Sequence, residues 1–487
     1  MKDASNAVPL VAQHSWPRGF IRRLIPLLPA SYTDSWRYGG VNRRILTAMV
    51  TVGVLTSIVK VASTLKEMLV ARQFGVGDGL DAFLIAYMLP SFAINVLAGS
   101  FSAALIPTYI QAREEDGKDA AQRLFSSVTV CSATLLSVLS VCLAAASSLI
   151  LPVLASSFHP EKLELTRQLF FILLPLLPLS GLFVTWAAVL NANERFAVAA
   201  IAPVITPIVT VVIVFALGNA WGVYSYALAA IIGVMVEGAI LANALIRQGV
   251  SIIPRWQGFT PQMKQVMKQY LPMIAAGILM SSTVVVDQAM AATLGHGSVS
   301  VLSYGNKAVA MTLAIGSLAI STAILPQFSR LVAARDWSGV RHTLKTYVAI
   351  VIAATVPITV ILLFASKLIV MGLFERGAFT TSNTLEVVGV QNLYLLQTPF
   401  YLTGMLFVRL ISALKANYIL MWGTVISAVL NISLDYFLMK WIGLPGIALS
   451  TSIVYITSFA FLAVMCSRAL DNSEQQSPSA VAVRAQI

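Results

Sequence analysis

The chain has 487 residues, of which 58% are hydrophobic and only 11% are charged, and its net charge is +12. A soluble fold cannot hide so much apolar surface, whereas lipid tails accept it, so the composition excludes a soluble protein. The basic residues gather in short loops and near the N-terminus, which indicates membrane topology and anionic headgroups rather than nucleic acid as a partner.

Residues 1–43 precede the first long apolar run and are mixed, polar and basic. No apolar stretch with a small-residue cleavage site follows directly, so we expect no secretory signal. The stretch from Trp16 to Leu28 alternates bulky apolar and basic residues. It either lies on the membrane surface or forms a disordered basic tail.

Apolar runs of about 20 residues recur along the rest of the chain, enough for a helix to cross roughly 30 Å of hydrocarbon. They predict an all-α polytopic membrane protein with about twelve transmembrane helices. The expected spans are 44–65, 81–110, 124–152, 167–190, 196–217, 222–246, 266–293, 299–328, 344–373, 386–411, 418–440 and 443–467.

Lysine and arginine are concentrated in alternate loops. The loops 218–221 and 294–298 contain neither residue, whereas the loops on the other side are basic. The positive-inside rule therefore predicts a multi-pass protein of the bacterial inner (plasma) membrane with both termini in the cytoplasm. The basic loops carry Arg113, Lys118, Arg123, Arg247, Arg255, Lys264, Lys268, Arg330, Arg335, Arg341 and Lys345.

The second half of the chain repeats the first at an offset of about 220 residues. Gly75-Val76-Gly77 corresponds to Gly295-His296-Gly297, and Ile106-Pro107 to Leu325-Pro326. An even number of spans in each half gives both halves the same orientation, so we expect two six-helix bundles related by a pseudo-two-fold axis along the membrane normal. The expected parts are a cytoplasmic basic segment 1–43, bundles 44–246 and 264–468, a cytoplasmic linker 247–263 and a cytoplasmic tail 469–487.

The first hairpin carries an unusual number of charges for a membrane segment. An ionisable group at mid-bilayer costs about 2.5–3.5 kcal/mol on insertion scales, which makes each one a functional candidate. Lys60 and Glu67 share a helix face, and Lys66, Arg72 and Asp81 follow around the hairpin. Lys60, Lys66, Arg72 and Asp81 predict a cationic patch that binds a phosphate or pyrophosphate, and Glu67 is a candidate for coupling or for an ion pair. Alternatively, Lys66, Arg72 and Asp81 snorkel to the outer interface.

Five further charges lie inside the other expected spans. Lys307 lies in a small, apolar helix far from both ends, so we expect it to bind the substrate. Asp287 either pairs with Lys307, binds a coupled cation or forms a buried salt bridge. Glu237, Arg409 and Asp435 are candidates for ion pairs among helices or for coupling.

Motifs of enzymes are missing. The sequence contains no Walker sequence, no HExxH and no Gly-x-Ser-x-Gly elbow, so we expect neither an enzyme nor catalytic residues. The four histidines are scattered, and Cys131, Cys142 and Cys466 have no paired spacing, so we expect no metal site, disulfide or cofactor.

Three segments together resemble the MurJ/MviN-type flippases of the multidrug/oligosaccharidyl-lipid/polysaccharide exporter superfamily. They are Lys66 to Gly75 with Asp81-Ala82-Phe83, Ser298 to Arg330, and Phe374 to Thr380. The resemblance implies export of undecaprenyl-pyrophosphate-linked sugars by alternating access, driven by the membrane potential, H⁺ or Na⁺. The family's basic residues contact the pyrophosphate, and the matching positions are Lys60, Lys66 and Lys307, with Asp81 as the matching acid.

Three departures from the family bear on the substrate. Lysines replace the usual arginines at these positions, and Ile94-Asn95 stand where the family has an Arg pair. The chain also ends soon after the expected twelfth span, without the family's last helix pair. These differences favour another lipid-linked repeat unit, such as an exopolysaccharide unit, over lipid II. Polysaccharide or cell-wall assembly enzymes are further candidate partners, beside the lipid-linked glycan and membrane lipids.

Two other functions are compatible with the bundle plan. A cation-coupled multidrug exporter of the same superfamily would depend on an acidic site more than on a basic patch, so the lysines argue against it. A membrane polysaccharide polymerase or ligase would need a large outer loop, whereas the longest expected outer loop is near Ser156 to Thr166.

Overall fold

The structure is a computed structural model that describes residues 41–475. The described part divides into two units at Ser57 and Ile58, inside helix α3 (Val41–Phe74). In the first unit, residues 41–57 are helical. The second unit contains the rest of α3 and every other described helix. The Trp16 to Leu28 stretch, the rest of 1–40 and the tail 476–487 lie outside the described residues.

The first half of the second unit is helical throughout, apart from short turns. Its first rod is α4, η2 and α5 in one continuous run, and η2 is a π-helical turn. The elements are the end of α3, α4 (Asp78–Ala93), η2 (Ile94–Ala98), α5 (Gly99–Glu115), α6 (Lys118–Leu154), α7 (Pro160–Leu173), α8 (Leu176–Ala192), α9 (Phe196–Ile201), η3 (Ala202–Val204), α10 (Ile205–Trp221) and α11 (Val223–Ile246).

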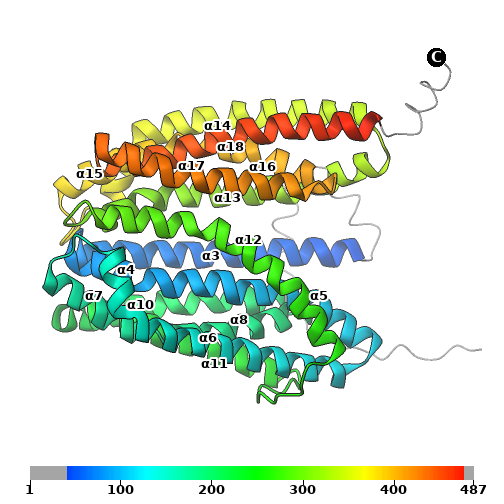
Figure 1. Ribbon diagram of the computed structural model, residues 1–487, viewed down its shortest axis with the longest axis horizontal. Helices are drawn as coiled ribbons and strands as arrows, with labels where there is room; N and C mark the ends of the chain where they lie inside the picture. The colour runs from blue at the N-terminus through cyan, green and yellow to red at the C-terminus, as the bar shows by residue number, and fades with distance from the viewer. Residues whose placement is uncertain (1–40, 476–487) are drawn as a thin grey trace, which may run out of the picture. The chain divides into compact units, whose positions relative to one another are not determined.

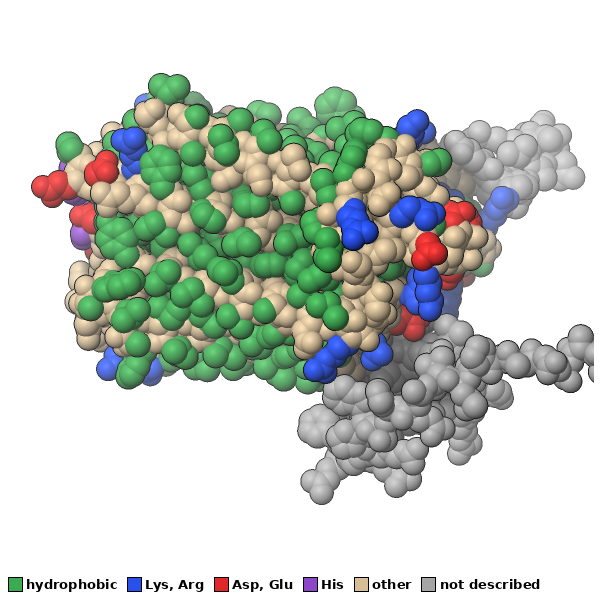
Figure 2. Space-filling view, turned by 90° about the horizontal axis from the view of Figure 1, so that it is seen from below, with side chains coloured by type: hydrophobic (Ala, Val, Ile, Leu, Met, Phe, Trp, Pro, Cys, Tyr) green, Lys and Arg blue, Asp and Glu red, His purple; other side chains and the backbone are tan. Residues whose placement is uncertain are grey.

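The second half repeats this plan. Its elements are α12 (Pro261–Ala292), α13 (Ser298–Ala333), α14 (Trp337–Phe374), α15 (Thr381–Leu395), α16 (Thr398–Ala413), α17 (Asn417–Ile442) and α18 (Leu444–Gln475). Ten helical rods of the described chain are long and apolar enough to cross a membrane, and α3 and α13 occupy the first and eighth expected spans. Figure 2 shows a face that is hydrophobic along its middle, with charged side chains gathered at its two ends. The all-α polytopic fold is therefore confirmed.

Packing follows the predicted repeat. α10 packs most extensively on α11, as α17 does on α18, and α8 contacts α5, α6 and α11 as α16 contacts α13, α14 and α18. Figure 1 shows α13 to α18 grouped on one side and α4 to α11 on the other. α12 belongs to both groups, because it packs against α4, η2, α5 and α6 and also against α17.

The helix ends differ from expectation mainly by being longer. The expected spans 44–65 and 344–373 belong to helices that run from Val41 to Phe74 and from Trp337 to Phe374. These helices continue beyond the apolar part of each span because polar residues at their ends form hydrogen bonds to free backbone groups. The Asp336 carboxylate, for example, accepts the Gly339 backbone N–H at 2.8 Å and caps α14. The linker ends at Thr260, whose hydroxyl caps α12.

Among the described residues outside α12, the hydrophobic core joins the two halves at one end only. One cluster contains residues of both halves, including Ala71 and Leu80 from the first and Val299 and Phe379 from the second. Near the α11–α12 linker, by contrast, two separate clusters lie within the first half with α12 and within the second half. We call the end that carries the linker the linker end and the other the far end.

Candidate functional site

Three charged residues join the two halves below the far end. The Glu67 carboxylate on α3 lies 2.9 Å from Lys66 Nζ and 3.0 Å from Lys307 Nζ on α13. Both ammonium groups share the same oxygen, Oε1. The structure thus brings the predicted Lys66 and Lys307 together, and Glu67 is the anion that links them across the halves.

Tyr226 on α11 supports this cluster from the first half. Its hydroxyl accepts a hydrogen bond from Lys66 Nζ at 3.2 Å, and its ring stacks on Phe83 with the centroids 4.0 Å apart. Aromatic stacking fixes the ring. Lys66 is therefore held in place by Tyr226 as well as by Glu67.

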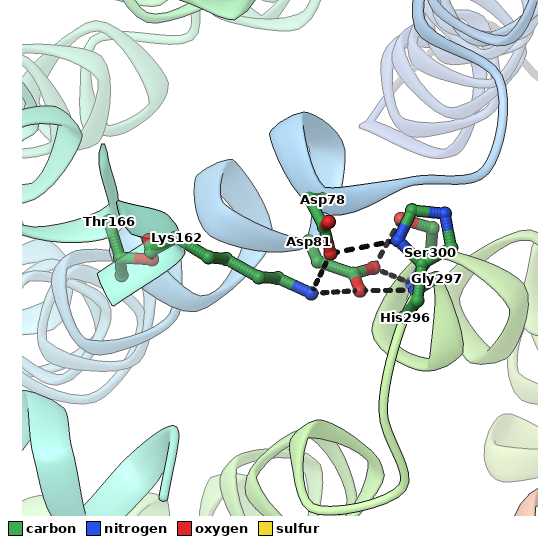
Figure 3. Close-up of polar contacts among 7 residues, drawn as sticks. All are labelled: Asp78, Asp81, Lys162, Thr166, His296, Gly297 and Ser300. Atoms are coloured by element: carbon green, nitrogen blue, oxygen red, sulfur yellow. Dashed lines mark hydrogen bonds and ion pairs between the residues drawn. The ribbon is translucent and has the colours of Figure 1, made fainter. Parts of the chain in front are cut away.

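Asp81 forms a second junction, at the far end. Its buried carboxylate accepts hydrogen bonds from the backbone N–H groups of Gly297 and Ser300, each at 2.8 Å, and from the Ser300 hydroxyl at 2.5 Å (Figure 3). These donors are the first turn of α13, whose helix dipole favours a negative charge there. In this conformation Asp81 is occupied by protein donors and does not snorkel.

Lys162 on α7 compensates the charge of Asp81 from within the first half. Its ammonium group lies 2.9 Å from Asp81 Oδ2 and 2.6 Å from Asp78 Oδ1, and only 4% of the residue is exposed. Asp78 also pairs with His296 Nδ1 at 2.9 Å, which adds an exposed contact across the halves (Figure 3). The sequence did not single out Lys162 or Asp78, because both stand in polar stretches typical of a solvated turn.

Glycines allow the two halves to touch backbone to backbone. The Ala378 N–H donates to the Arg72 carbonyl at 2.8 Å. A Cβ on Gly377, which has a φ of +62°, would lie 2.4 Å from that carbonyl oxygen, and one on Gly297 would lie 2.5 Å from Val76 Cγ1. The two repeated Gly-x-Gly turns thus lie against each other at the far end.

The loop that contacts Arg72 is held by its own carboxylate. Glu375 accepts hydrogen bonds from Thr384 Oγ1 at 2.6 Å and from Thr381 Oγ1 at 2.8 Å. These two bonds hold the pKa of Glu375 below its ordinary value. The charged carboxylate fixes the loop at the start of α15.

Replacement of Gly377 with alanine is expected to lower the melting temperature of the protein. A non-glycine residue at a left-handed φ costs about 1–2 kcal/mol, and the clash with the Arg72 carbonyl adds to this. Thermal unfolding in detergent measures the effect. Gly372→Ala is the matched control, because its Cβ meets nothing within 4 Å and it lies inside α14. Equal melting temperatures for the two variants would contradict the close contact.

Asp287 does not pair with Lys307, which corrects one expectation. Lys307 is occupied by Glu67, whereas the Asp287 carboxyl on α12 lies beside Asp435 on α17, with Asn431 and Thr451 next to it. Both Asp435 oxygens, Asp287 Oδ1 and Asn431 Oδ1 are buried without a hydrogen-bond donor among the described residues. The two acids form a carboxylate pair within the second half, because α12 and α17 pack together there.

The other predicted residues lie apart from the lysine cluster. Glu237 accepts a hydrogen bond from Thr206 Oγ1 at 2.9 Å on the neighbouring α10, and Arg409 donates to Ser321 Oγ at 2.7 Å. Neither forms an ion pair with another residue of the described chain. Lys60 and Arg72 have exposed side chains, and Lys60 lies about two turns before Glu67 on the same face.

The position of the missing Arg pair has a distinct backbone. Ile94 and Asn95 begin the π-helical turn η2, which packs against α12. Single π-turns inside α-helices are frequent at functional sites. Asn95 is exposed and starts a row of exposed residues along one face of α5 that continues with Gly99, Ala103 and Pro107.

The contacts define one conformation of a two-lobed transporter. Within the described part of the chain, every hydrogen bond and ion pair between residues 58–246 and 293–475 lies at the far end or at Glu67. The halves are therefore closed together at the far end. The fold and these contacts are those of a two-lobed membrane transporter.

Comparison with known proteins gives the family. The family model described as lipid II flippase MurJ matches residues 70–485, and the chain belongs to this family. The probable lipid II flippase MurJ of Synechocystis sp. is 27% identical over 86% of this chain and 81% of the relative. That of Vibrio cholerae is 25% identical over 87% and 83%.

Solved structures show the same fold. A structure described as lipid II flippase MurJ in an inward closed conformation superposes with a TM-score of 0.74 at 24% identity, covering 87% of this chain and 90% of the other. An inward-facing multidrug resistance transporter of the MATE family gives 0.70 at 15% identity, covering 88% and 99%. The resemblance predicted from the sequence is confirmed, and with it a multi-pass inner-membrane transporter.

Proposed function

We propose that this chain flips lipid II, the undecaprenyl-pyrophosphate-linked cell-wall precursor, by alternating access. The observation that carries the proposal is the Lys66–Glu67–Lys307 cluster, which places two cations at the junction of the halves. A pyrophosphate is the part of the cargo that such cations recognise, through charge-assisted hydrogen bonds. Family membership supports the choice of lipid II.

The cluster can respond to the cargo because Glu67 is shared. Lys307 is the more exposed partner, with 41% of its side chain accessible compared with 20% for Lys66. A pyrophosphate that approaches Lys307 competes with Glu67 for the ammonium group and so weakens the tie between α3 and α13. Lys60, exposed on the same face as Glu67, adds a further cation. Cargo binding thereby favours separation of the halves at the far end.

The direction of loading follows from topology. The linker end carries the basic loops, so the positive-inside rule places it, and both termini, in the cytoplasm. A protein closed at the far end then takes its cargo from the cytoplasmic side. Asp81 and its partners are the contacts that must break for release on the other side.

The Asp287–Asp435 pair is our candidate for the coupling site. Two adjacent buried carboxylates cannot both stay charged without a shared proton or a cation. Their unpaired oxygens, with the Asn431 amide, suit a hard cation such as Na⁺ as well as H⁺. Because α12 packs on both halves, a change of charge on Asp287 reaches the first half directly.

Asp435→Asn is expected to abolish any ion-dependent stabilisation. A site that binds Na⁺ in the folded state raises the melting temperature as Na⁺ replaces choline, and the variant should lose this shift. Glu237→Gln is the matched control, because Glu237 lies on α11 away from the pair. If Asp435→Asn kept the Na⁺-dependent shift in melting temperature, the Asp287–Asp435 pair would not be the Na⁺ site. The same comparison of melting temperatures across pH tests H⁺.

Asn95 favours a second candidate cargo. Asn95 stands where the family has an Arg pair, so the positive charge beside η2 is lower. This difference favours a lipid-linked glycan other than lipid II, such as an exopolysaccharide unit. Rescue of a bacterium depleted of its own lipid II flippase distinguishes the two. Growth with the native chain supports lipid II, and no growth with the protein present in the membrane would contradict lipid II and favour the exopolysaccharide unit.

A further inference from the structure

The linker between α11 and α12 is fastened along the side of α6. Ser251 exchanges two hydrogen bonds with the Gln122 side chain, at 2.8 and 3.1 Å, and Arg255 exchanges two with the Ser126 hydroxyl, at 2.9 and 2.5 Å. Figure 1 shows this segment beside the ends of α11 and α6. We call residues 250–260 the linker strap. Its course is fixed by side chains of the first half.

The strap has an inner and an outer face. Val250 and Ile252 pack on the core of the first half. The outer face carries Ile253, Trp256 and Phe259, which are 61%, 48% and 62% exposed. The ring centroids of Trp256 and Phe259 lie 5.2 Å apart. Three large apolar side chains in so short a segment are unfavourable in water.

The position of the strap along α6 places this apolar face at the edge of the membrane. α6 has 37 residues, whereas about 20 suffice to cross the hydrocarbon, so about eight at each end lie in the interfacial layers if the span is centred. The strap contacts Gln122 to Ser127, at the inner edge of this first interfacial stretch. Residues 124–129 of α6 beside it are all buried, whereas Val138 and Val141 further along α6 are 55% and 69% exposed.

Positive charge accompanies the apolar face. Arg255 is exposed in the strap, Arg247 precedes it, and Lys264 and Lys268 follow as exposed residues of α12. None of the four forms an ion pair with an acid of the described chain. Aromatic rings at the interface beside unpaired cations are the features that bind anionic lipid headgroups.

We propose that the linker strap is a lipid-binding anchor. Ile253, Trp256 and Phe259 insert at the boundary between headgroups and acyl chains, and Arg255 with Lys264 binds the headgroup phosphate of an anionic phospholipid. The strap ends at Thr260, which caps α12, the helix that packs on both halves. Lipid binding thus fixes the linker end of α12 to the first half. The proposal does not depend on the cargo.

Tryptophan quenching by brominated lipids tests the anchor in the full-length protein. The chain is reconstituted in phosphatidylcholine bilayers with bromines near the headgroup, and the quenched fluorescence of the native chain is compared with that of Trp256→Phe. We expect the Trp256 contribution, obtained by difference, to be strongly quenched. Trp441→Phe gives the quenching of an accessible tryptophan elsewhere in the same protein for comparison, because Trp441 is 85% exposed at the end of α17.

Charge recognition is tested by titrating brominated phosphatidylglycerol into the same bilayers. The Trp256 signal should report preferential binding of phosphatidylglycerol, and Arg255→Gln should lower this preference about fivefold. Arg376→Gln, at the far end, should leave it unchanged. A Trp256 contribution that no brominated lipid quenches would overturn the anchor and indicate a protein partner for this face. Quenching without any preference for phosphatidylglycerol would overturn the anionic site.

Discussion

Asp81→Asn is expected to open the far end and to stop transport. The Asp81 carboxylate accepts three hydrogen bonds from the first turn of α13 and one from Lys162. An asparagine removes the charge, and its side-chain NH₂ group would face the donors of Lys162, Gly297 or Ser300. Breaking a buried charged pair costs about 3–5 kcal/mol, so the equilibrium between closed and open far ends should shift roughly a hundredfold or more.

Cysteine labelling measures this opening. Val76 contacts Gly297 when the far end is closed, so a Val76→Cys reporter, in a chain whose three native cysteines are replaced, is protected from a membrane-impermeant maleimide. Asp81→Asn should raise its labelling rate. Asp78→Asn, which removes only the half-exposed partner of Lys162 and His296, should have a much smaller effect. Equal labelling in the Asp81 variant and its parent would show that Asp81 does not hold the gate.

Lys307→Ala is expected to lower transport roughly ten- to hundredfold, the value of a charge-assisted hydrogen bond. The variant removes the exposed cation and the link from α13 to Glu67 at once. Lys307→Arg keeps the charge and should retain part of the activity.

Rescue of flippase-depleted cells at matched expression measures the loss. Lys345→Ala is the matched control, since Lys345 is exposed near the linker end and forms no ion pair in the described chain. Full rescue by Lys307→Ala would exclude Lys307 from cargo binding.

The sequence predicted most of the fold because each span is a local signal. Hydrophobic runs identified the helices, and the repeat of Gly75-Val76-Gly77 as Gly295-His296-Gly297 identified the two halves. That these two turns lie against each other could not be predicted, since it depends on how the halves meet.

The site was predicted in part for the same reason. Lys66, Glu67 and Lys307 stood out as charges in apolar helices, and the structure brings them together. Lys162 did not stand out, because it lies between Glu161 and Glu164 on a helix that reads as solvated. The contact of Asp287 with Asp435 could not be predicted, because spacing along the chain does not show that α12 and α17 pack together.

A flipping assay with the purified chain tests lipid II as the cargo without the complications of a living cell. Vesicles that contain the protein and a fluorescent lipid II are treated with a membrane-impermeant reductant that bleaches only the outer leaflet. We expect nearly complete bleaching with the native chain and bleaching of the outer leaflet alone without protein. With Lys307→Ala, bleaching beyond the outer leaflet should be roughly ten- to hundredfold slower than with the native chain. Bleaching limited to the outer leaflet with the native, folded chain would contradict lipid II as the cargo.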